Sequence, residues 1–130
     1  MADIYDRGVN VIAGGKACTL VLTTGAAREI AKKYGGLDKL GDKLLKGKDE
    51  NETIGIILSL TVLLANQGAE LYNESHPDKK RNMLTEEYLM LHTTPADMRT
   101  LQESLVRALV LGTKRDVESE DDGKNVPAAG

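Results

Sequence analysis

The residue types that carry most enzymatic chemistry are few in this chain. It contains two histidines, His76 and His92, and a single cysteine, Cys18. Neither histidine has a second ligand at the spacing of a known metal-binding motif. Cys18 falls in the middle of a predicted strand, on the face expected to be buried, where a thiol behaves as a small apolar side chain rather than as an activated nucleophile. The sequence therefore predicts no metal site and no catalytic cysteine.

Paired carboxylates and a glycine-rich turn have structural explanations as well. Glu86 and Glu87 lie at a predicted helix start, where negative charge is favourable. The acidic residues at 120–122 belong to a charged C-terminal stretch. The segment 14–16, Gly-Gly-Lys, lacks the spacing of a phosphate-binding loop and is followed by a predicted strand instead of a helix. We expect neither catalytic nor cofactor-binding residues, and hence a protein that is not an enzyme.

A basic stretch from Arg28 to Lys48 is the strongest candidate binding surface for a nucleic acid. It holds seven cations and three acidic residues, a local balance of +4. The side chains that would contact nucleic acid are Arg28, Lys32, Lys33, Lys39 and Lys43. The alternative is a solvated lysine face with helical ion pairs such as Glu29 with Lys33.

Length and composition point to one folded domain with a charged end. The 130 residues are 41% hydrophobic and 28% charged, with a net charge of -3. Phe and Trp are absent, so the core must be aliphatic, and few rings are available to stack on bases. We predict a single globular domain over 1–112 and a charged, flexible tail over 113–130.

The N-terminal third predicts a hairpin followed by two helices. Runs 9–13 and 17–22 are rich in β-branched and apolar residues, and the glycines between them suit a tight turn. Apolar spacing then predicts a helix from a cap at 23–25 to the glycine pair at 35–36, and a second helix from Leu37 that Gly47 closes.

An apolar run over 54–65 predicts the central helix. It carries apolar groups on every side and should begin at a cap on Asn51 and continue to about Tyr72. A membrane span needs about 20 apolar residues. This run has 12 residues before Asn66, so we interpret it as a core helix and expect no membrane association.

The remaining segments predict an exposed loop and two more helices. The loop, 73–83, includes the basic residues 79–81. Thr85 can cap a short helix, and the sequence Thr-Pro-Ala-Asp at 94–97 is a complete start signal for a last helix that Gly112 should end. The expected fold class is therefore α+β, mainly helical, with an N-terminal β-hairpin packed on about five α-helices.

Several segments together resemble the tail assembly chaperones of long-tailed bacteriophages and prophages of Gram-positive bacteria. The likeness runs from about Tyr5 to Arg115. The segments that carry it are Tyr5–Ile12, Gly14–Lys16, Leu20–Thr24, Ala27–Leu37 and Leu63–Gly68. They form a pattern of hydrophobic and glycine positions and include no catalytic signature. Ala17 and Cys18 stand where such sequences more often carry a polar and an aromatic residue.

The resemblance implies binding rather than turnover. Such chaperones coat the tape measure protein in the cytoplasm of the bacterial host, help to recruit tail tube protein, and are absent from the mature virion. The expected partners are thus the tape measure protein and the tail tube protein, and a hairpin edge or an apolar groove would also permit a homo-oligomer. The alternative is a small nucleic-acid-binding regulatory protein that uses the basic face from Arg28 to Lys48.

Overall fold

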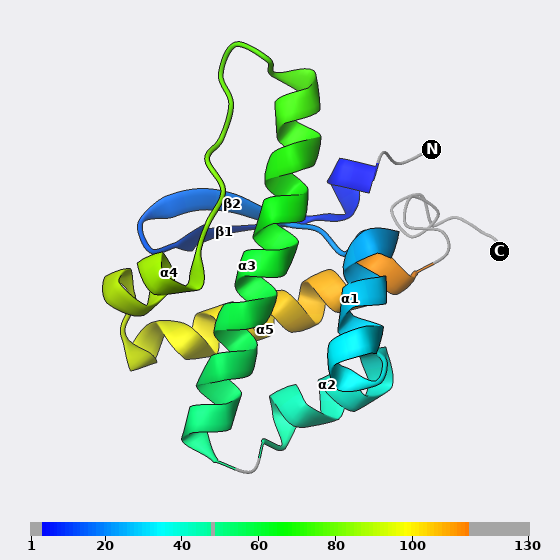
Figure 1. Ribbon diagram of the computed structural model, residues 1–130, viewed down its shortest axis with the longest axis vertical. Coiled ribbons are helices and arrows are strands. Elements are labelled where there is room, and N and C mark those ends of the chain that lie inside the picture. Colours follow the sequence, from blue (N-terminus) through cyan, green and yellow to red (C-terminus); the bar gives the residue numbers. More distant parts are fainter. Residues whose placement is uncertain (1–3, 48, 115–130) are drawn as a thin grey trace, which may run out of the picture.

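The computed structural model describes residues 4–47 and 49–114 and has the expected fold class (Figure 1). Within that part of the chain, five α-helices and one 3-10 helix accompany one antiparallel two-stranded hairpin. In chain order the elements are the 3-10 helix η1 (Ile4–Arg7), the strands β1 (Val9–Ala13) and β2 (Lys16–Leu20), and the helices α1 (Thr24–Tyr34), α2 (Leu37–Leu45), α3 (Glu50–Ser75), α4 (Glu86–His92) and α5 (Pro95–Thr113). Except for Thr113 and Lys114, the predicted tail lies outside the described residues.

The hairpin turns at Gly14 and Gly15, as predicted. Their φ angles are +59° and +80°, which a glycine adopts without steric cost. Lys16 belongs to β2 rather than to the turn and pairs with Ala13. The second strand is shorter than predicted, because it ends at Leu20, and the N–H of Val21 turns away to donate to the Leu64 carbonyl of α3 at 3.2 Å.

Helix α3 begins earlier and ends later than its pattern predicts. Asp49, not Asn51, is the N-cap, and its carboxylate accepts from the N–H of Glu52 at 2.7 Å. The helix then runs to Ser75, beyond the predicted end near Tyr72. Most of the 54–65 run is buried or half-buried, with Gly55 exposed.

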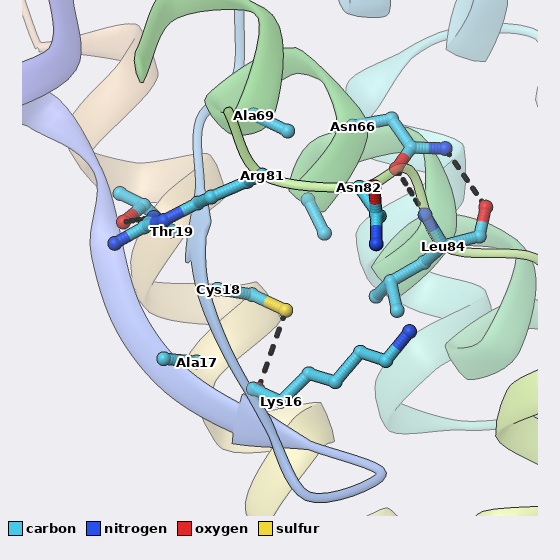
Figure 2. A pocket seen from close by; sticks show the side chains of 10 residues that line it. Lys16, Ala17, Cys18, Thr19, Asn66, Ala69, Arg81, Asn82 and Leu84 are labelled. Carbon is cyan, nitrogen blue, oxygen red and sulfur yellow. Dashed lines mark hydrogen bonds between the residues drawn. The ribbon is translucent and has the colours of Figure 1, made fainter. Parts of the chain in front are cut away.

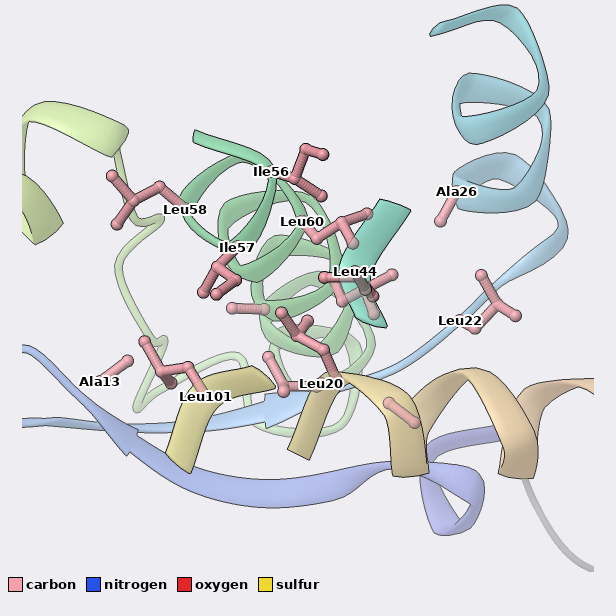
Figure 3. Close-up of a cluster of buried hydrophobic side chains, with 14 of the residues drawn as sticks. Ala13, Leu20, Leu22, Ala26, Leu44, Ile56, Ile57, Leu58, Leu60 and Leu101 are labelled. Atoms are coloured by element: carbon pink, nitrogen blue, oxygen red, sulfur yellow. The ribbon is translucent and has the colours of Figure 1, made fainter. Parts of the chain in front are cut away.

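Among the described residues, one helix, α3, is long and apolar enough to cross a bilayer by length and composition. Its most apolar window has a mean hydropathy of 1.5, and half of that window is buried inside the protein. Leucines and isoleucines of α3 point into a cluster with side chains of β2, α2 and α5 (Figure 3). The labelled members include Leu20, Leu44, Ile57, Leu60 and Leu101. This helix is therefore the centre of the core.

The hairpin packs on α3 through a close backbone contact. At Gly68, which is buried, an added Cβ would lie 1.8 Å from the carbonyl oxygen of Thr19 on β2. Only a glycine lets the strand approach the helix this closely. The contact fixes the position of β2 across the middle of α3 (Figure 1).

Helix α5 starts as predicted and ends later. Pro95 is its first residue, and the Thr94 N–H donates to the Asp97 carboxylate at 2.8 Å. The prediction that Gly112 ends the helix is wrong, since α5 continues to Thr113. A Cβ at Gly112 would lie 2.6 Å from the Cβ of Leu22, so this glycine serves packing between α5 and the segment after β2.

Candidate functional site

Two cavities adjoin along strand β2 and share Ala17, Cys18 and Arg81. The first, of about 240 Å³, lies between β2, α3 and the loop before α4 (Figure 2). The second, of about 420 Å³, lies against the hairpin and η1. We call the two together the hairpin groove. Its lining residues are Tyr5, Asn10, Val11, Ile12, Lys16, Ala17, Cys18, Thr19, Ala65, Asn66, Ala69, Arg81, Asn82 and Leu84.

Arg81 connects the loop to the hairpin and is not simply exposed, which corrects the prediction for residues 79–81. Its guanidinium carbon lies 4.0 Å from the centre of the Tyr72 ring. Nη1 donates to the Tyr5 hydroxyl at 3.2 Å and to Oγ1 of Thr19 at 3.3 Å. The Asn73 side chain fixes the backbone, accepting from the Arg81 N–H at 2.7 Å and donating to its carbonyl at 3.0 Å. The position of Arg81 is thus determined at both ends.

Thr19 is the buried centre of this polar contact. Its side chain is 3% exposed although it lies on the same face of the hairpin as the exposed Asn10. Oγ1 donates to Oδ1 of Asn10 at 2.8 Å and lies 2.8 Å from the Tyr5 hydroxyl. These bonds hold η1, β1 and β2 together, so the groove has a fixed wall.

The opposite end of the groove is fixed by α4 and by Asn66. The Tyr88 hydroxyl donates to the Gly14 carbonyl at 2.8 Å, and the Lys16 ammonium lies 4.2 Å from the centre of the Tyr88 ring. Asn66 accepts from the Leu84 N–H at 2.7 Å and donates to its carbonyl at 3.0 Å (Figure 2). The hairpin turn and the loop are therefore anchored independently of any ligand.

Cys18 lies in the wall shared by both cavities and is half-buried. Sγ donates to the Lys16 carbonyl at 3.5 Å. Burial raises the pKa of the Cys18 thiol above its usual range, while the positive charges of Arg81 and Lys16 and a backbone hydrogen bond act in the opposite direction. The thiol is thus predominantly protonated at neutral pH and close to two cations.

Alkylation of Cys18 by iodoacetamide is expected to be slower in the native chain at pH 8 than in the chain unfolded by urea. The thiolate is the nucleophile, and the raised pKa lowers its population in the folded state. The native rate should keep rising at pH values where the rate for the unfolded chain has levelled off. Mass spectrometry of timed samples measures both rates, and equal native and unfolded rates at pH 8 would contradict the burial of the thiol.

An exposed apolar side chain lines the groove. Ile12 on β1 is 68% exposed and lines the larger of the two cavities. Isolated exposed apolar residues are ordinary on protein surfaces. Here, however, Ile12 lines a cavity whose walls are held by hydrogen bonds, so its exposed apolar surface belongs to a concave site.

The structure places the predicted nucleic-acid residues on the exposed sides of α1 and α2, away from this groove. Lys32 pairs with Glu29 at 3.6 Å, so the acidic partner expected for Lys33 is taken by its neighbour. Lys33 donates instead to Ser59 at 2.8 Å, and Lys43 pairs with Glu52 at 3.7 Å. Arg28 and Lys39 are exposed. The nucleic-acid hypothesis stays a prediction, with three of its five cations in contacts within the chain.

Both histidines are exposed, and each stacks on a tyrosine one helical turn earlier. The ring centres are 3.9 Å apart for His76 and Tyr72 and 4.0 Å apart for His92 and Tyr88. Within residues 4–47 and 49–114, no three His, Cys, Asp or Glu side chains are grouped to hold a metal ion.

Comparison of the chain with protein-family models, with curated proteins and with solved structures gives no match.

Proposed function

We propose that this protein is a phage tail assembly chaperone that binds the tape measure protein in the cytoplasm of the bacterial host and assists tail tube assembly. The sequence resemblance supports the choice of partner, and the hairpin groove is the binding surface that we assign to it. A tape measure protein is long and largely helical, so it exposes apolar side chains until the tail assembles around it. Its chaperone needs an apolar surface that is ready to bind.

The observation that carries the proposal is the exposed Ile12 at the opening of a cavity with fixed walls. Contacts of Thr19 and Arg81 on one side and of Tyr88 on the other hold these walls. Binding to a preorganised surface costs less conformational entropy than binding that must first order a loop. The groove therefore suits a partner that supplies a short apolar segment.

Co-expression with the tape measure protein encoded nearest to this gene tests the proposal. We expect the full chain to raise the soluble yield of the tape measure protein and to elute with it as a complex in size-exclusion chromatography. Ile12→Thr removes apolar surface from the groove and keeps a β-branched side chain in the strand. It should weaken the complex about tenfold, which calorimetric titration measures.

Leu45→Thr is the matched control, because Leu45 on α2 is 67% exposed, almost the same as Ile12, but does not line the groove. The affinity of this variant for the tape measure protein should stay within about twofold of that of the unmodified chain. Absence of any complex between the two proteins would overturn the proposed function. If both variants lowered the affinity for the tape measure protein equally, the binding surface would not lie at the hairpin.

A further inference from the structure

The charge in the hairpin groove has one sign. Lys16 and Arg81 are its charged lining residues, and no aspartate or glutamate is among those that line it. Within the described parts of the chain, neither cation has a carboxylate within ion-pair distance. A positive surface enclosed by low-dielectric walls favours an anionic group.

The Arg81 side chain is held in an orientation that suits an anionic group. Stacking on Tyr72 and the two bonds of Nη1 fix the plane of the guanidinium. Within residues 4–47 and 49–114, its Nε and Nη2 donate no hydrogen bond. These two nitrogens form the edge that binds a carboxylate through two parallel hydrogen bonds. A half-buried guanidinium gains most from a partner that supplies both acceptors.

The other lining residues favour a protein partner over a nucleic acid. Val11, Ile12 and Ala17 are apolar and offer no stacking surface for a base. Tyr5 is the one aromatic residue among those that line the groove, and its hydroxyl is bonded to Thr19 and Arg81. The Tyr72 ring is already stacked with His76 and covered by Arg81. The groove therefore matches a segment that places an acidic side chain next to an apolar one.

We propose that the hairpin groove binds a segment of the tape measure protein through an acidic side chain, whose carboxylate lies on Arg81 with Lys16 nearby, while a neighbouring apolar side chain of the segment packs on Ile12. This inference rests on the proposed function and adds the chemistry of the recognised segment. It also places the bound segment over Cys18, which lies in the wall between the two cavities.

Because Cys18 is the single cysteine of the chain, its alkylation reports occupancy of the groove directly. The probes are overlapping 20-residue synthetic peptides of the tape measure protein encoded nearest to this gene. Each peptide is made in its native form and with every Asp and Glu changed to Asn and Gln. We expect one or more native peptides to slow the reaction of Cys18 with iodoacetamide, and their amide forms to bind at least about tenfold more weakly.

Variants of the full chain assign the effect to the groove. Arg81→Lys keeps the charge and loses the two-nitrogen edge, and Lys16→Gln removes the second charge, so each should lower the affinity for the protecting peptide. Lys39→Gln on α2 removes an exposed charge elsewhere and should leave that affinity unchanged. Circular dichroism spectra matching that of the unmodified chain show that each variant is folded.

The outcomes separate this inference from the proposed function. The contact between an acidic side chain of the partner and Arg81 is refuted if the whole tape measure protein forms a complex but leaves Cys18 unprotected. It is also refuted if the native and amide peptides bind equally. Either result leaves the proposed chaperone function intact. If the whole tape measure protein does not bind, both the proposed function and the proposed contact with Arg81 are refuted. If amide substitutions at the chain's own Glu118, Glu120, Asp121 and Asp122 speed the alkylation without any peptide, the groove is occupied by this chain and the inference is overturned.

Discussion

Replacing Gly68 with alanine is expected to lower the free energy of unfolding by about 3 kcal/mol, at the upper end of overpacking effects in well-packed cores. The added Cβ would meet the Thr19 carbonyl oxygen at 1.8 Å. Neither atom can rotate away, because the oxygen belongs to the backbone of β2 and the Cβ is bonded directly to the backbone of α3. The strand must therefore move off α3. Urea denaturation followed by circular dichroism measures the loss.

Gly55→Ala is the control on the same helix. Gly55 is exposed, and a Cβ built there would have nothing within 4 Å except its chain neighbours and the backbone of its own helix. Alanine is the better helix former, so this variant should gain about 0.5 to 1 kcal/mol. Two identical substitutions in one helix are thus expected to have opposite signs. A loss below about 1 kcal/mol for Gly68→Ala would show that the strand yields readily and that the groove wall is not fixed.

Leu105→Ala is expected to cost about 3 kcal/mol and to lower the midpoint of thermal unfolding by about 10 °C. Leu105 lies in the buried face of α5 and is 0% exposed, so truncation leaves a cavity in the core. Helix α5 also packs on β1 and α3, which limits how far the cavity can collapse.

Val110→Ala on the same helix gives the comparison. Val110 is 47% exposed, so its truncation should change the free energy of unfolding by less than about 0.5 kcal/mol. Differential scanning calorimetry of both variants measures the two effects. Similar losses for the two would mean that α5 contributes to stability through its length rather than through its buried face.

The helix and strand boundaries that depend on local chemistry were predictable from the sequence. The glycine turn at 14–15 and the start signal at 94–97 act through bonds between near neighbours in the chain. The start of α3 is harder to predict, because Asp49 and Asn51 are both good caps and only Asp49 is used. Gly112 has the residue type of a helix end, whereas its close contact with Leu22 explains its presence.

The groove could not have been predicted from the sequence, because its parts are distant along the chain. Arg81 stands in a run of basic residues that is typical of an exposed loop, and nothing nearby indicates its contact with Thr19, 62 positions away. Cys18 lies on a predicted strand and Lys16 in the predicted turn, but the residues that enclose them come from α3 and the loop before α4. Such contacts arise from tertiary packing, which periodicity does not encode.

The packing of the first strands against the last helix has a consequence for synthesis in the cell. Val9 and Ala13 of the hairpin are buried with α5 in place, so the core cannot close until residues near 113 have left the ribosome. At about 5 to 20 residues per second, the apolar run of α3 precedes α5 by roughly 2 to 10 s. During that interval the apolar run of α3 is exposed on the nascent chain. We expect general chaperones of the cell to bind this run until α5 has been synthesised and the core can close.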